Sequence, residues 1–143
     1  MNNREPQLTA LFCDSVRQEV GGTQSFIGVY QDQILFKSFP VGFSRLSVFM
    51  SLHAYEDVFD SVAFEVFEEG TGEVMMGIET GNKDQLRERL KSVDLRLDRG
   101  VRVAATLEAQ NIQIDSPTVI GVRCRLGDGR EFLSRTKLEI KQA

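Results

Sequence analysis

The sequence predicts an all-β fold, specifically a two-sheet β-sandwich of about eight strands with one short helix. Three observations support this. Apolar and polar residues alternate over several segments, glycine-rich turns separate those segments, and a single segment has helical spacing. The chain of 143 residues, 41% hydrophobic and 27% charged, suits one globular domain spanning 1–143. Periodicity alone leaves a β-barrel open as the alternative.

The first expected strand pair spans 12–30, FCDSVRQEVGGTQSFIGVY. Gly21 and Gly22 suit a two-residue hairpin turn, because both can adopt positive φ. A turn there sets Val16 opposite Ile27 and buries one face of the pair, formed by Val16, Val20, Ile27 and Val29. On the other face Arg17 is expected to lie over an aromatic ring. Gly28 leaves room for a neighbouring side chain or a bend.

Four later segments alternate in the same way: 45–54, 101–109, 118–126 and 131–140. The first of them places its apolar residues on one face, namely Leu46, Val48, Met50 and Leu52. In the third, Ile120, Val122, Cys124 and Leu126 oppose Arg123 and Arg125. We expect each apolar set to face the core.

The turns agree with these strands. EEGTGE, residues 68–73, is expected to turn 62–67 back into 74–78, and the glycines of LGDGRE join 118–126 to the closing strand. The segment 82–93, NKDQLRERLKSV, instead has three apolar residues at helical spacing and Asn82 as a candidate N-cap. It is predicted to be the short helix.

The pattern C-D-x-x-R-x-E-x-x-G, followed by I-G-V-Y and then F-P, resembles an uncharacterised family of small bacterial and phage proteins that is known only as a domain of unknown function. The residues that carry the resemblance are Cys13, Asp14, Arg17, Glu19, Gly22, Ile27, Gly28, Val29, Tyr30, Phe39 and Pro40. They lie in the first third of the chain, with a weaker echo in the closing hairpin. The resemblance implies an all-β fold and no established activity, and it supplies no catalytic residues.

The sequence offers few residues for nucleophilic catalysis or metal binding. Cys13 would need a base to act as a nucleophile, and His53 is the chain's one histidine. Cys13 and Cys124 match no metal spacing, so we expect two buried thiols in a reducing compartment. Two acidic stretches, 53–60 and 67–73, could lie at neighbouring ends of the sandwich and bind calcium, but they lack the spacing of a calcium loop. The prediction is no enzyme, no cofactor, and no catalytic or metal-binding residue.

The charge of the chain indicates which classes of partner are favoured. The net charge is −4, which disfavours nucleic acid as a partner. From 46 to 82 there is no Lys or Arg while eight acidic residues occur, so we expect an acidic surface there. No apolar run is long enough for a signal peptide or a membrane helix. We therefore expect a cytoplasmic protein (host cytoplasm if phage-encoded) without a membrane partner.

These observations favour a non-enzymatic protein that binds a protein partner or associates with itself. Exposed edge strands would allow self-association by extension of a sheet. The candidate binding surface consists of Tyr55, Glu56, Asp57, Phe59, Asp60, Glu68 and Glu69. Two alternatives are a phage-encoded inhibitor of a host defence system, acting through an acidic surface, and a virion or tail accessory domain.

Overall fold

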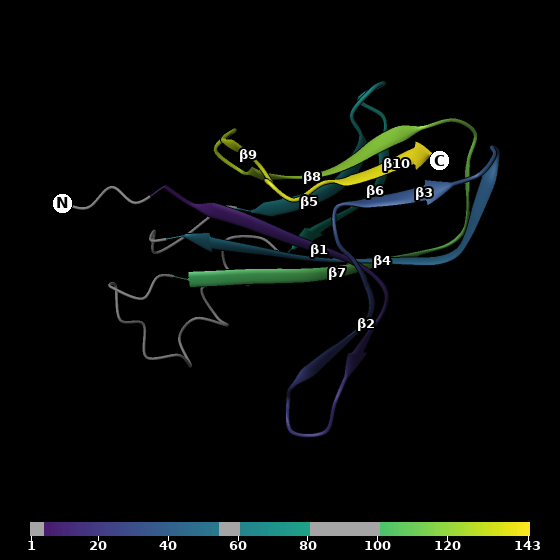
Figure 1. The fold of residues 1–143 in the computed structure, drawn as a ribbon. Coiled ribbons are helices and arrows are strands. Elements are labelled where there is room, and N and C mark those ends of the chain that lie inside the picture. The colour runs from purple at the N-terminus through teal and green to yellow at the C-terminus, as the bar shows by residue number, and fades with distance from the viewer. Residues whose placement is uncertain (1–4, 55–60, 81–100) are drawn as a thin grey trace.

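Two β-sheets form the structure, a computed structural model that describes residues 5–54, 61–80 and 101–143. The described residues contain ten strands (Figure 1). Within these ranges no helix has the length and apolarity needed to cross a membrane. The all-β prediction is confirmed, while the predicted helix at 82–93 lies outside the described residues.

The four-stranded sheet is antiparallel and has the order β2-β1-β4-β7. Its strands are β1 (Gln7–Gln18), β2 (Gln24–Tyr30), β4 (Val41–Ala54) and β7 (Val101–Ile114). β4 lies between β1 and β7; it pairs with β7 along almost its whole length and with β1 from Ser47 to His53.

The six-stranded sheet has the order β3-β10-β8-β5-β6, with β9 also paired to β8. Its strands are β3 (Gln33–Phe36), β5 (Val62–Glu68), β6 (Val74–Thr80), β8 (Thr118–Leu126), β9 (Glu131–Leu133) and β10 (Leu138–Gln142). β3 pairs with β10 in parallel, and the other pairs are antiparallel. β3 follows β2 after two residues, so the chain crosses from one sheet to the other at this point.

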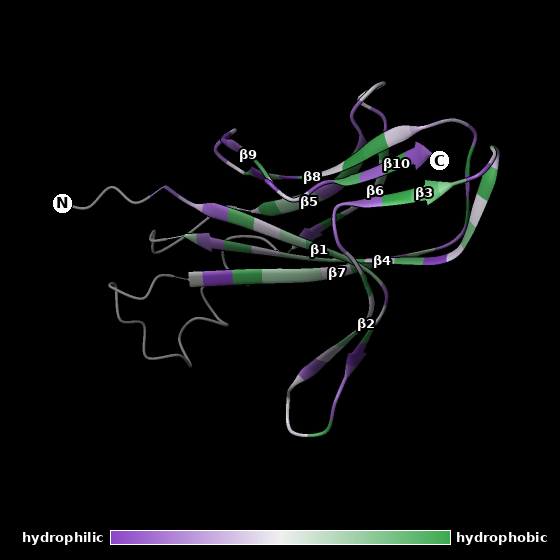
Figure 2. Ribbon diagram, viewed as in Figure 1, coloured by the Kyte–Doolittle hydropathy of each residue, from purple (hydrophilic) through white to green (hydrophobic). Residues whose placement is uncertain are grey.

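The core lies between the facing sides of the two sheets. The predicted inward residues of β4 are fully buried, namely Leu46, Val48, Met50 and Leu52, and those of β8 are buried as well. Side chains alternate between the two faces of a strand, and Figure 2 shows the matching alternation of hydropathy along the strands. Arg123 and Arg125 of β8 lie on the face away from the core, whereas Ser47 and Ser51, between the inward residues of β4, are themselves buried. Burying each of the large inward side chains contributes about 1.5–3 kcal/mol. The strand periodicity is therefore confirmed where it was clearest.

Both predicted turns are present. The amide of Glu68 donates to the carbonyl of Glu73 at 2.9 Å, which closes the β5–β6 turn. The amide of Leu126 donates to the carbonyl of Arg130 at 2.9 Å, which closes the β8–β9 turn. Gly72 and Gly129 have φ of 74° and 95°, values that L-residues rarely adopt.

The closing segment 131–140 was predicted as one strand, and the structure divides it. Leu133 pairs with Arg123, and Leu138 pairs with Ile120. Five steps along one strand therefore match three along the other, so two extra residues bulge out between β9 and β10. The buried Ser134 holds this break, since its amide donates to the carbonyl of Val122 at 2.9 Å.

Candidate functional site

The β1–β2 hairpin leaves the sandwich and projects from it (Figure 1). We call residues 14–30 the projecting hairpin. Its loop is one residue longer than predicted, because Glu19 donates its amide to the carbonyl of Thr23 at 2.8 Å. Val20, Gly21 and Gly22 form the loop, and both glycines have positive φ, 95° and 85°.

The longer loop changes the register of the hairpin by one residue. Val16 lies opposite Phe26, whereas the prediction set it opposite Ile27. A slip of one residue exchanges the two faces of a strand. The predicted burial is therefore wrong for three of its four residues: Val20, Ile27 and Val29 are exposed, and Val16 is half-buried.

The base of the hairpin is a corner built by Asp14, Gly28 and Tyr30. Gly28 has φ 66°, and a Cβ at this position would overlap the carboxylate of Asp14. The prediction that Gly28 makes room for a side chain is thus confirmed. The hydroxyl of Tyr30 donates to Oδ1 of Asp14. Burial and then this hydrogen bond to a carboxylate raise the pKa of Tyr30 to about 12.

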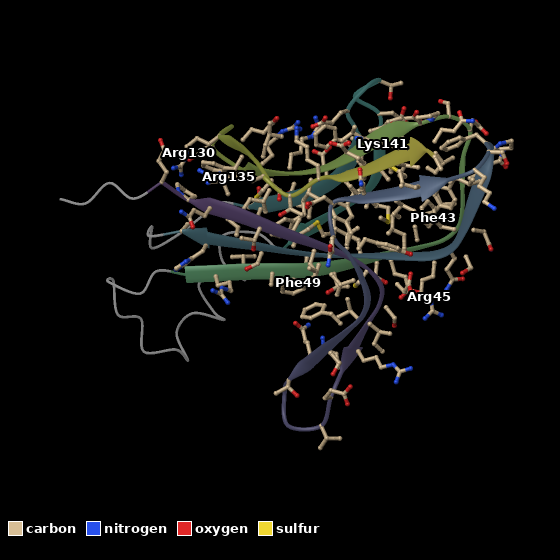
Figure 3. All side chains as sticks on the ribbon, viewed as in Figure 1. Phe43, Arg45, Phe49, Arg130, Arg135 and Lys141 are labelled. Carbon is tan, nitrogen blue, oxygen red and sulfur yellow. The ribbon has the colours of Figure 1, made fainter. Side chains whose placement is uncertain are left out.

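Two further contacts tie this corner to β4. Oγ of Ser47 donates to the backbone carbonyl of Asp14 at 3.3 Å. Phe26 packs edge-to-face on Phe49 with the ring centroids 5.2 Å apart, and Figure 3 shows Phe49 beside the hairpin. The predicted stacking of Arg17 on a ring is not found among the described residues; Arg17 is exposed. These contacts fix the direction in which the hairpin projects.

A cluster of aromatic rings continues from the corner toward β3. Tyr30 and Phe36 each pack edge-to-face on Phe43, with centroids 6.3 and 5.7 Å apart, and Phe39 packs on Phe36 at 6.2 Å. Asp14, Gly28, Tyr30 and Phe39 thus have structural contacts in one region of the molecule.

The two thiols are buried and free. The pKa of Cys13 is raised, mainly by burial and further by the charge of Asp14, against an opposing backbone hydrogen bond at Ser15. Burial alone raises the pKa of Cys124 to about 12. A raised pKa reduces the thiolate fraction and with it the nucleophilicity.

His53 lies far from Cys13. Cys13 pairs with Ser47 on β4, and His53 is six residues farther along the same strand, which is about 20 Å. The described residues therefore contain no pairing of this thiol with this histidine. They also contain no group of three or more side chains able to hold a metal ion.

The acidic stretch 46–82 contributes to a mixed charged face on the six-stranded sheet. Glu65 lies opposite Arg123, and their side chains join at 2.9 Å, Oε2 to Nη2. Arg125 bridges Glu65 and Glu131 at 3.6 and 3.3 Å. Because β8 brings two arginines against β5, the charge of Glu65 is compensated by residues far from it in the sequence.

The aromatic neighbour of this face is Phe67. The guanidinium of Arg123 lies 4.7 Å from the Phe67 ring centroid. The ring lies over Gly121, where a Cβ would come within 3.1 Å of Cζ of Phe67. Gly121 therefore lets the ring and the guanidinium stack close to the sheet.

Of the seven residues of the predicted binding surface, Glu68 and Glu69 are described, and 55–60 lie outside the described residues. Glu69 is paired with Lys137, Oε1 to Nζ at 2.5 Å. Its amide donates to the carbonyl of Val119 at 2.9 Å, whereas Ser61 at the other end of β5 accepts from the amide of Gly127 at 2.9 Å. Ser61 and Glu69 thus lie at opposite ends of the sheet.

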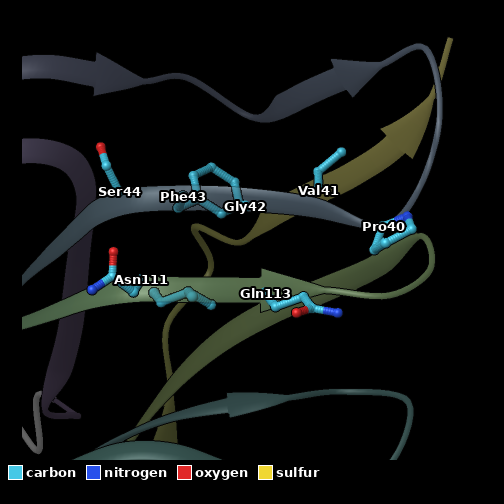
Figure 4. Close-up of a pocket in the computed structure, with 8 residues that line it drawn as sticks. Pro40, Val41, Gly42, Phe43, Ser44, Asn111 and Gln113 are labelled. Carbon is cyan, nitrogen blue, oxygen red and sulfur yellow. The ribbon is translucent and has the colours of Figure 1, made fainter.

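Two shallow recesses adjoin β4 and β7. The first, of about 430 Å³, is lined by 40–44 and 111–113, with Asn111 at φ 54° (Figure 4). None of its lining residues titrates, so it offers no acid or base. The second, of about 420 Å³, contains Asp14 and Arg45, which already have partners in Tyr30 and Glu108.

No protein-family model matches the chain, and no curated protein matches it. The resemblance to a family of small bacterial and phage proteins therefore stays a prediction. What sequence reasoning missed is the exposed apolar surface of the projecting hairpin. Two features of the sequence could have indicated this surface. Residues 20–31 contain no charged residue, and Gly21 and Gly22 also fit a three-residue loop in place of the predicted two-residue turn.

Proposed function

We propose that this protein is a non-enzymatic binding module that holds a protein partner, or a second copy of itself, through the projecting hairpin. The observation that carries the proposal is the exposure of Val20, Ile27 and Val29 on an arm that extends away from the sandwich. Apolar side chains gathered on a protruding element are typical of interaction surfaces.

Two further features support this function. The segment 20–31 is uncharged, so burying its own side chains takes no charge out of water, and the exposed Arg17 lies beside it on the paired strand. The arm is also held in one direction by the contacts of Asp14 and by the packing of Phe26 on Phe49. An arm that is already ordered loses less conformational entropy on binding.

Two measurements test this proposal. The tagged protein is used to capture partners from its native cells, and its mass in solution shows whether it forms a dimer. The double variant Ile27→Lys, Val29→Lys is the probe. Ile78→Lys, Val74→Lys is a closely matched control, because Ile27 and Val29 are 41% and 46% exposed and Ile78 and Val74 are 40% and 44% exposed. We expect the first variant to lose the partner or the dimer and the second to retain it, with both folded. Equal capture by both variants would reject the hairpin as the interface.

The two alternatives predict different results. An inhibitor of host defence should restore phage plating on a defence-bearing host, and an accessory domain should be found in purified particles. The inhibitor was proposed to act through an acidic surface. The pairing of Glu65 and Glu69 with basic side chains gives that mechanism less support than the hairpin has.

A further inference from the structure

The first half of β1 has one unpaired edge. β4 pairs with β1 from Gln7 to Cys13, but β2 pairs with the other edge only from Phe12 onward. Among the described residues, 7–11 therefore have no strand partner on the side away from β4. Main-chain groups at such an edge are free to accept another strand.

β9 presents a second unpaired edge. One edge of β9 pairs with β8 through residues 123–125, and no strand within the described ranges pairs with the other. After the break at Ser134, β10 pairs with a different part of β8 from β9, so β10 does not cover the free edge of β9. β9 and the start of β1 lie at the same end of the molecule (Figure 1).

Between these two edges lies a groove of about 780 Å³. It is lined on one side by 5–9 and on the other by 131–133, Arg135 and Thr136. We call it the β1/β9 groove. Leu8 and Phe132 face the core side of the groove, and the exposed Leu133 faces outward.

The unpaired main-chain edges point to the class of occupant. A row of free amides and carbonyls is satisfied best by another extended chain, as in strand addition. The edge strand of a folded domain has a neighbouring strand of its own, which would collide with the second side of the groove. A single extended segment has no such neighbour and fits between the two sides. Residues 7–13 of β1 carry no charge, so no charged side chain of this paired half of the strand repels an added strand; Glu5 precedes it in the groove lining.

Side chains around the groove specify the occupant further. Inward-facing side chains of an added strand would meet Leu8 and Phe132, which favours apolar residues there. On the outward face, Arg135 is exposed and forms no ion pair with the described residues, while Glu131 is already paired with Arg125. A carboxylate of the occupant would complement Arg135.

We propose that the β1/β9 groove binds a single extended segment of another polypeptide as an added β-strand, with apolar side chains against Leu8 and Phe132 and a carboxylate at Arg135. This site is separate from the projecting hairpin and does not depend on it.

Peptides are selected from a displayed library of random linear peptides, with the folded full chain as bait. The affinity of an enriched peptide is then measured for the wild type and for variants. Arg135→Glu removes the partner of the occupant's carboxylate, and Leu133→Asp adds a carboxylate to the groove lining that repels it, so each should weaken binding at least about tenfold. Leu35→Asp is the matched control, since Leu35 and Leu133 are 55% and 59% exposed on the same sheet, and its affinity should be unchanged. The hairpin variant Ile27→Lys, Val29→Lys should also bind normally, which separates this test from that of the proposed function.

Two readouts distinguish strand addition from contact by side chains alone. The bound peptide should slow amide hydrogen exchange at 7–11 and 131–133, and N-methylation of its backbone should abolish binding. The proposal is overturned if no peptide is enriched, if binding survives Leu133→Asp and Arg135→Glu, or if N-methylation has no effect. A dimer that Leu133→Asp dissociates would overturn it as well, because the occupant would then be a second copy.

Discussion

The carboxylate of Asp14 lies directly over Gly28, which stands between the cross-strand pairs Cys13–Val29 and Ser15–Ile27. This contact places a charged side chain where any other residue would have its Cβ. It also orients the carboxylate toward the hydroxyl of Tyr30. The corner therefore depends on a glycine for two reasons, the positive φ and the space.

Gly28→Ala should destabilise the fold by about 2 kcal/mol or more, because alanine is strained at φ 66° and its Cβ displaces Asp14. Urea unfolding measures the loss. Gly70→Ala is the control, since no atom lies within 4 Å of a Cβ added there. Equal effects of the two substitutions would contradict the corner.

Tyr30→Phe should remove stability only where the hydroxyl is protonated. The pKa of Tyr30 rises from 10.0 to about 12 on folding, through burial and the bond to Asp14. The contribution is then complete below pH 10 and is lost between pH 10 and about 12. The difference in unfolding free energy between wild type and Tyr30→Phe, measured across this window, should shrink as the pH rises. A difference that does not change with pH would exclude this linkage.

The ion pair of Glu65 and Arg123 should be strongly coupled. Both side chains are mostly buried, and Nε of Arg123 has no hydrogen-bond partner in the described structure, so removing Glu65 leaves a buried charge uncompensated. A double-mutant cycle should give a coupling of about 1–3 kcal/mol. The exposed pair of Glu139 and Lys141, at 2.8 Å, should give no more than about 0.5 kcal/mol. Similar couplings for both pairs would show that burial is not the cause.

The buried faces of β4 and β8 could be predicted because strand periodicity is local. Leu46 and Leu52, or Ile120 and Leu126, carry the pattern within a few residues. The register of the projecting hairpin could not, since Gly21 and Gly22 fit a loop of either two or three residues. One residue of difference moved Ile27 from the buried face to the exposed one.

The charged face illustrates a second limit. Glu65 belongs to a stretch without basic residues, and its partner Arg123 lies 58 residues away. Sheet topology, which periodicity does not contain, decides that β8 lies beside β5. The unpaired edges of β1 and β9 were hidden for the same reason, because they depend on where β2 and β10 end relative to their neighbours.

The two thiols should differ in how fast they react in the folded protein. Cys124 lies in β8, inside the six-stranded sheet, whereas Cys13 lies beside the base of the projecting hairpin. Opening of the hairpin should expose Cys13 without unfolding the core, so it should react faster than Cys124, and both at least about a hundredfold more slowly than in urea. Ellman's reagent measures these rates in Cys13→Ala and Cys124→Ala.

Gly28→Ala provides the internal check, because it should accelerate Cys13 far more than Cys124 by weakening the corner. Rapid labelling of Cys13 in the intact protein would mean instead that its thiol is accessible and ionised. Cys13 would then be able to act as a nucleophile, which would contradict the proposed non-enzymatic function.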